Sequence, residues 1–146
     1  MTGKLLPQRN LGIDLALECA NAALAEARKR GYPSTVAVTD RAGHLLVLLR
    51  NDGGGPHLVD SARRKAYTAA SANTRTSVME KAVDERTGVP DHNLIFVENL
   101  LMVGGGVPIR AGDDLVGAIG VAGSPGAIHD EECADAGIAK IAGSLK

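Results

Sequence analysis

Residues 34–50 read STVAVTDRAGHLLVLLR, which is two apolar runs on either side of a polar connection. Ser34–Thr39 is rich in β-branched side chains and alternates in polarity, and this pattern predicts a strand. Asp40–Gly43 has the composition of a turn, and His44–Arg50 is a second apolar run. Because the connection is short and ends in glycine, we predict an antiparallel hairpin. The second strand is apolar on both faces, so we expect it to be central in a sheet or covered.

Helical patterns lie on both sides of this hairpin. Small and apolar residues recur at helical spacing from Asn10, a candidate N-cap, to Gly31, a candidate C-cap. Pro56 suits the first turn of a second helix, in which a stripe of alanines would allow a close approach to a neighbouring element. A shorter helical segment is predicted over Thr74–Val89.

The C-terminal half alternates strand and helix patterns again. Apolar runs at 94–97 and 100–103 precede two predicted strands at 107–110 and 115–121. A last helix is expected from about Ile128 to Ile141, with acidic residues in its first turn, where they suit the helix dipole. Short links between strands favour antiparallel pairing. We therefore predict one α+β domain over residues 1–146, with an antiparallel sheet of about five strands flanked by helices.

Composition excludes several classes of protein. The chain has 146 residues, a formal net charge of −1 and an aromatic content of 2%, a poor basis for binding nucleic acid. No apolar run is long enough for a membrane-spanning helix or a signal peptide, so we expect a cytoplasmic protein with no membrane partner. Cys19 and Cys133 are isolated in the sequence, and we expect free thiols rather than a disulfide.

The loop after the hairpin holds the first group of reactive side chains. Residues 50–57 read RNDGGGPH, and the N-terminus of the following helix would offer N–H groups to a carboxylate or phosphate. An ordinary strand-to-helix loop explains the same composition. His57 is followed at helical spacing by Asp60, Ser61 and Lys65, which suits acid–base chemistry, a metal or simply a solvated face. A desolvated Lys65 would serve as a base, and a salt-bridged structural lysine is the commoner case.

Two further groups lie in the C-terminal half. Gly104–Pro108 makes room either for a flat ligand or another subunit, or forms a hairpin connection. His129 and Cys133 are spaced i,i+4 at the start of the last helix. Imidazole and thiolate on one helical face are a candidate half-site for a metal or for axial ligation of haem. The alternative is an exposed histidine beside a buried thiol.

Six motifs in order resemble the GlcG/HbpS-like haem-binding family, and also the C-terminal domain of PduO-type proteins. They are AVTDRAGHL (37–45), RNDG (50–53), ARRKAYTA (62–69), GGVPI (105–109), GAIGVAG (117–123) and DEECA (130–134). The resemblance implies a profilin-like fold and homo-oligomers, whether dimer, tetramer or octamer. It also implies a ligand pocket, and some members of the family bind or degrade haem. The pocket residues carried over by position are Arg50, Asp52, Lys65, Thr68, Gly105 and Pro108.

Three functional hypotheses follow. The first is a small-ligand-binding protein with haem or a related tetrapyrrole as ligand, for which His57, His129 and Tyr67 are candidate axial ligands. The second is an isomerase or lyase that acts without a cofactor on a small carboxylate-bearing metabolite. In that enzyme Arg50 would clamp the carboxylate, Lys65 or His57 would be the base, and Asp52 would orient it. The third is an oligomeric regulatory or interaction module.

Overall fold

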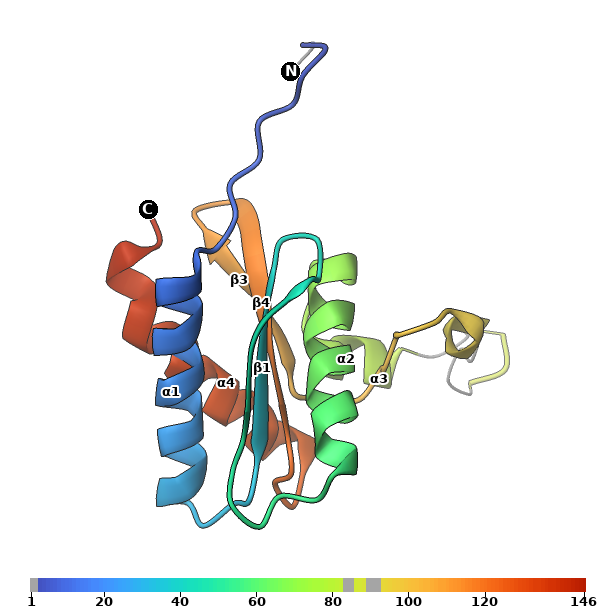
Figure 1. Ribbon diagram of the computed structural model, residues 1–146. Helices are drawn as coiled ribbons and strands as arrows, with labels where there is room; N and C mark the ends of the chain where they lie inside the picture. The colour runs from blue at the N-terminus through green and yellow to red at the C-terminus, as the bar shows by residue number, and fades with distance from the viewer. Residues whose placement is uncertain (1–2, 83–85, 89–92) are drawn as a thin grey trace.

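The computed structural model describes residues 3–82, 86–88 and 93–146. Its helices and strands, in chain order, are α1 (Ile13–Lys29), β1 (Thr35–Asp40), β2 (Leu45–Arg50), α2 (His57–Ala72), α3 (Thr76–Lys81), β3 (Gly106–Ala111), β4 (Asp114–Ala122) and α4 (Ala127–Ile141). Two short 3-10 helices are η1 (Asn93–Phe96) and η2 (Ala142–Ser144). This order confirms the predicted α+β class (Figure 1).

One antiparallel sheet forms the centre of the fold. Within the described residues it has four strands in the order β2-β1-β4-β3, one fewer than the five or so expected. The apolar run at 94–97 is the reason, because it lies in and after η1, where its side chains are exposed, instead of pairing with the sheet. The N-terminal strands β1 and β2 pair as the predicted hairpin, and β1 also pairs with β4 far along the chain.

Strand β2 was expected to be either central or covered, and the first alternative is wrong because the strand lies at an edge of the sheet. It is apolar on both faces because each face packs partly on a helix layer. Leu46 and Leu49 pack against the larger core cluster, while Leu48 packs against the smaller cluster on the other face. Leu45 is exposed at the start of the strand. The strand is therefore half-covered on both sides.

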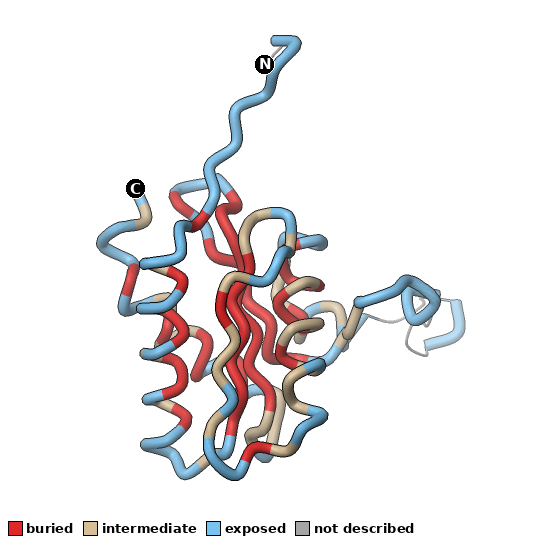
Figure 2. The backbone as a smooth tube through the Cα atoms, in the orientation of Figure 1, coloured by how far each residue is buried: buried red, intermediate tan, exposed pale blue. Residues whose placement is uncertain are grey.

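The helices form a layer on each face of the sheet. Helices α1 and α4 cover one face, and α2 covers the other (Figure 1). The larger core lies between the sheet and α1 with α4, and it includes Val36, Val38, Ile119 and Val121. On the α2 side, alanines of the helix meet alanines of the sheet. The buried residues in Figure 2 follow these two interfaces. No helix in the described part of the chain is long and apolar enough to cross a membrane.

The ends of helices α1 and α3 agree in part with the ends predicted from the sequence. Gly31 has a φ of +79° just past the end of α1, so the predicted left-handed C-terminal glycine is confirmed. The N-cap of α1 is Gly12 rather than Asn10, whose side chain instead accepts a hydrogen bond from the Arg41 N–H at 3.0 Å. The helical segment predicted over 74–89 is reduced to α3, and its residues 83–85 and 89 lie outside the described residues.

Glycines allow α2 to approach the sheet closely. A Cβ atom at Gly120 on β4 would lie 2.2 Å from the carbonyl oxygen of Ala62 and 2.6 Å from the amide nitrogen of Ala66. A Cβ atom at Gly106 on β3 would lie 2.3 Å from the carbonyl oxygen of Lys65. These contacts are with backbone, which cannot rotate away. Helix α2 is therefore held at a distance that only glycine permits.

We predict that Gly120→Ala lowers the free energy of unfolding by at least about 1–3 kcal/mol, because the helix must move away from the sheet. Urea denaturation followed by circular dichroism measures the change. Gly143→Ala is the matched control, since nothing lies within 4 Å of a Cβ there. Equal stability of the two variants would contradict the close-contact argument.

Candidate functional site

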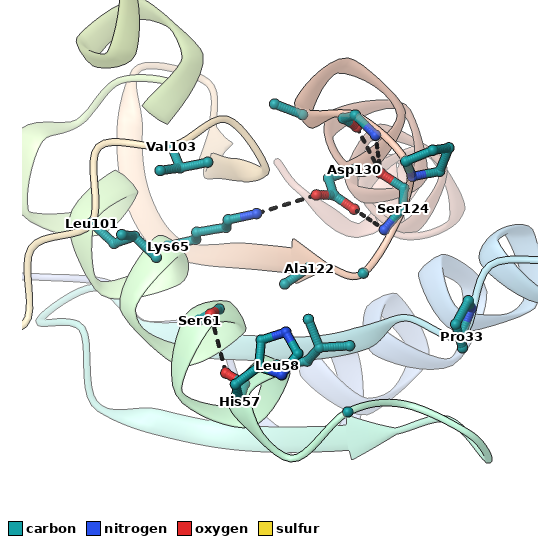
Figure 3. Close-up of a pocket in the computed structure, with 15 residues that line it drawn as sticks. Pro33, His57, Leu58, Ser61, Lys65, Leu101, Val103, Ala122, Ser124 and Asp130 are labelled. Atoms are coloured by element: carbon teal, nitrogen blue, oxygen red, sulfur yellow. Dashed lines mark hydrogen bonds and ion pairs between the residues drawn. The ribbon is translucent and has the colours of Figure 1, made fainter.

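A cleft of about 640 Å³ opens where the first turns of α2 and α4 face each other beside the end of β4 (Figure 3). This volume lies in the range typical of small-molecule sites. Its apolar lining includes Pro33, Leu58, Leu101, Val103, Ala122, Pro125 and Ala127. Its polar side chains are those of His57, Ser61, Lys65, Ser124 and Asp130. Apolar walls with a few convergent polar groups are the usual composition of a ligand site.

The inner end of the cleft holds a buried ion pair. Lys65 extends from α2 and its Nζ lies 3.2 Å from Oδ2 of Asp130 on α4 (Figure 3). Both side chains are only 6% exposed. The same ammonium donates to the backbone carbonyl of Val121 at 3.1 Å. Lys65 thus joins α2, β4 and α4 through a single charged group.

Asp130 is held by two neighbours. Its Oδ1 accepts a hydrogen bond from the Ser124 N–H at 3.1 Å, while Oδ2 faces Lys65. Burial raises the pKa of the Asp130 carboxyl above its ordinary value, although the Lys65 charge and the Ser124 hydrogen bond act in the opposite direction. The carboxylate is therefore costly to keep charged in this position, and Lys65 is the charge that offsets that cost.

Glycine at position 105 makes room for the ammonium. Gly105 has a φ of +132°, and a Cβ there would lie 2.9 Å from Nζ of Lys65 and 2.3 Å from the Val121 carbonyl oxygen. The neighbouring Gly106 N–H donates to Oγ1 of Thr76 at 2.8 Å. The sequence predicted that this segment makes room for a flat ligand or another subunit, or forms a hairpin connection, whereas the space at Gly105 is occupied by the Lys65 side chain of the same protein.

Glu131, next to Asp130, is a buried structural link. Its Oε1 accepts from the Ser77 N–H at 3.1 Å and from the Gly105 N–H at 3.4 Å. Its Oε2 lies 3.3 Å from the Arg75 guanidinium. These contacts tie α3 and the Gly105 segment to α4, so they hold the wall behind Lys65 in place.

His57 lies at the mouth of the cleft, on the first turn of α2. The residue is exposed, and a Cβ at Gly55 would come within 2.9 Å of its Nδ1, so glycine there lets the ring fold back over the loop. Ser61 donates to the His57 backbone carbonyl at 3.1 Å. Among the described residues, the imidazole nitrogens of His57 have no hydrogen-bond partner. The ring is therefore available to a ligand.

Several sequence-predicted site residues do not line the cleft. Arg50 donates to the Gly54 carbonyl at 2.8 Å, and Asp52 is exposed in the loop. Thr68 is buried, donating to the Arg64 carbonyl and accepting from the Leu101 N–H. Pro108 is buried in β3. The structure brings His57 and Lys65 together in the cleft, with Gly105 behind the lysine, and leaves the other four outside its lining.

His129 and Cys133 do not line the cleft, and their side chains lie in different environments. The His129 ring lies 3.4 Å from Oε2 of Glu132 and 5.9 Å from the Tyr32 ring, measured between centroids. Cys133 is fully buried in the core between α4 and the sheet. Within the described residues, no group of three or more histidine, cysteine, aspartate or glutamate side chains is arranged to hold a metal.

Tyr67, the other candidate axial ligand, packs beside Gly43 and does not line the cleft. A Cβ at Gly43 would come within 2.7 Å of the tyrosine ring. The ring therefore fills space above the hairpin turn. Of the candidate axial ligands, His57 alone lines the cleft in the described part of the chain.

Sequence reasoning placed Asp130 among the acidic residues that suit the dipole at the start of the last helix, and so missed its pairing with Lys65. A signal was present in the pattern of α4. The buried positions of this helix include 130, 133, 134, 137 and 141, which is one helical face. Asp130 lies on that apolar stripe, where an unpaired carboxylate is unfavourable. The pattern required a cationic partner, but it could not identify Lys65 as that partner.

The fold and the cleft define a small α+β protein with a site sized for a small molecule. The chain belongs to the family described as haem degrading protein HbpS-like, whose model matches residues 11–139. The protein GlcG of Escherichia coli K12 is 34% identical over 112 residues, which cover 73% of this chain and 80% of GlcG. These findings confirm the family resemblance found in the sequence.

Solved structures share the fold. A double mutant of HbpS from Streptomyces reticuli is 40% identical, with a TM-score of 0.85, and the match covers 95% of this chain and 92% of that one. A structure described as a PduOC:haem complex is 23% identical, with a TM-score of 0.81, over 90% of this chain and 95% of that one. At that identity the second likeness concerns the fold alone.

The first prediction for this site concerns the ion pair. Asp130→Ala should destabilise the protein by about 3 kcal/mol or more, because it leaves the buried Lys65 ammonium without its counter-charge. The double variant Lys65→Met with Asp130→Leu should recover most of that loss, since no charge is then left unpaired. Asp60→Ala, which breaks an exposed pair with Arg63, is the control and should cost less than about 1 kcal/mol. Urea unfolding measures all three, and a double variant as unstable as the single one would refute this account.

The second prediction concerns the thiols. Burial raises the pKa of Cys19 to about 12 and that of Cys133 to about 11. Because the thiolate is the reactive form, neither should react at pH 8 with a disulfide reagent such as DTNB while the protein is folded. Both should react promptly in 8 M urea, which serves as the control. Rapid reaction of Cys133 in the folded protein would contradict its buried position.

Proposed function

We propose that this protein binds haem or a related tetrapyrrole in the cleft, with His57 as the ligand to the iron. The observation that carries the proposal is the unpartnered imidazole of His57 beside an apolar wall formed by Leu58, Leu101 and Val103. The description of the family as haem degrading, and the haem complex of a structural relative, support the choice of ligand.

The residues of the cleft fit such a group. Histidine is the commonest protein ligand of haem iron, and the ring of His57 offers a nitrogen with no competing hydrogen bond among the described residues. The apolar side chains would contact the faces of the macrocycle and exclude water from them. When bound, haem would supply the iron chemistry, while this chain's residues would bind and orient the ring.

The cofactor-independent enzyme gains no specific support from the geometry. It required Arg50 to clamp a carboxylate near Lys65, with Asp52 as the partner of the base. Arg50 instead donates to the Gly54 carbonyl, and neither Arg50 nor Asp52 lines the cleft. Asp130, rather than Asp52, pairs with Lys65. Ligand binding is therefore the function that the arrangement favours.

A haemin titration tests the proposal. The wild type should give a sharp, saturable Soret band, and His57→Ala should weaken binding by about tenfold or more or change the spectrum, because one iron ligand is lost. His129→Ala is the matched control and should bind as the wild type does, since His129 pairs with Glu132 outside the cleft lining.

Two results would count against this assignment. A wild-type spectrum that stays broad, like that of unbound haemin, would exclude haem as a ligand. A His57→Ala variant with the wild-type band and affinity would keep haem but remove His57 as its ligand.

A further inference from the structure

The ammonium of Lys65 is incompletely satisfied by the protein. A lysine ammonium carries three N–H donors. Two are used, by Val121 O at 3.1 Å and by Asp130 Oδ2 at 3.2 Å. Within the described residues, no third acceptor lies in hydrogen-bond distance, and Lys65 lines the cleft (Figure 3). One charged donor of a side chain only 6% exposed is thus left for a ligand in the cleft.

Two helix N-termini add partial positive charge near the Lys65 ammonium. The first turn of α2, with His57 and Leu58, and the start of α4, with Gly126 and Ala127, both line the cleft. Neither helix has a side-chain hydrogen bond at its N-cap. Helix N-termini carry partial positive charge, which favours anions. The N–H groups of Leu58 and His129 already donate to the Gly55 and Gly126 carbonyls, so the contribution of these N-termini is mainly this partial charge. Asp130 offsets the lysine charge, but no other acidic side chain lines the cleft among the described residues.

We propose that the inner end of the cleft is a carboxylate subsite, and that the ligand is an organic acid whose carboxylate binds the third N–H donor of Lys65. The carboxylate would lie between Lys65 and the N-termini of α2 and α4, and the apolar body would lie against Leu58, Leu101 and Val103. This deepens the proposed function by naming the polar group of the ligand, and it uses the same cleft without requiring iron.

The apolar lining selects an organic acid over an inorganic anion. A free phosphate or sulfate would leave the walls formed by Leu58, Leu101 and Val103 in contact with water. An organic acid covers those walls and places one charge at the ammonium. Charge-assisted hydrogen bonds contribute roughly 1.5–3 kcal/mol, which corresponds to about a tenfold to hundredfold gain in affinity.

Benzoate and benzamide are probes that differ in charge and have nearly the same shape. We would titrate each into the ¹⁵N-labelled protein and follow amide shifts by NMR. Benzoate should bind at least about tenfold more tightly than benzamide, with shifts centred on Ser124, Ala127 and the first turn of α2. In Lys65→Met this ratio should fall to near one. Lys29→Met, which removes an exposed charge at the end of α1, is the control and should keep the ratio.

The wild-type comparison stands even if Lys65→Met fails to fold, because it varies the ligand only. Equal binding of the two probes, or no binding of either, overturns the carboxylate subsite, as does inorganic phosphate binding as tightly as benzoate. Preferential benzoate binding with no Soret band for haemin supports the subsite and refutes the tetrapyrrole assignment. A Soret band for haemin with no preference for benzoate over benzamide supports the tetrapyrrole assignment and refutes the carboxylate subsite.

Discussion

The close approach of helix α2 to the sheet is the constraint on which the site depends. Gly106 and Gly120 let the helix backbone rest on β3 and β4 at distances that a single added methyl group would prevent. This contact fixes the point at which Lys65 leaves the helix, so that its ammonium reaches past Gly105 to Asp130 on α4. A helix packed at an ordinary distance would move the ammonium away from β4, where it could no longer donate to the Val121 carbonyl. The cleft is therefore a consequence of backbone packing as well as of its lining side chains.

The ion pair at the end of this cleft is a weak source of stability. Removing two charges from water costs several kcal/mol for each ion, and a well-packed apolar pair of similar size often stabilises a fold equally well or better. The side chains around Lys65 and Asp130 include Val103 and Ala122, so an apolar pair would suit the location. Retention of charge in such a place is easier to understand when the charge also acts on a ligand, which is the inference drawn from the third N–H donor of Lys65.

Much of the fold could be predicted from local patterns, because those patterns report local burial. The β1–β2 hairpin, the glycine after α1 and the last helix all follow from periodicity or turn chemistry within a few residues. The edge position of β2 could not be predicted in this way, because it depends on the pairing of β1 with β4. These two strands are far apart in the sequence, so no local pattern indicates that they pair. The apolar run at 94–97 has the composition of a strand, but it does not pair with either edge strand of the sheet, β2 or β3.

The residues of the candidate site show the same difference between local patterns and long-range contacts. Lys65 and His57, which line the cleft, could be named as candidates from local sequence patterns, while Asp130 was missed because its partner comes from another helix. The two ends of the cleft also differ in how firmly their side chains are held. Lys65 is fixed by Asp130, Val121 and the Gly105 segment, whereas His57 lies exposed on a first turn beside a glycine-rich loop. The fixed end would determine how a ligand is oriented, and the exposed end would adapt to what that ligand presents at the mouth. A ligand held only at the mouth would have no such orientation, so under this proposal the buried ammonium would be the group that makes the cleft selective.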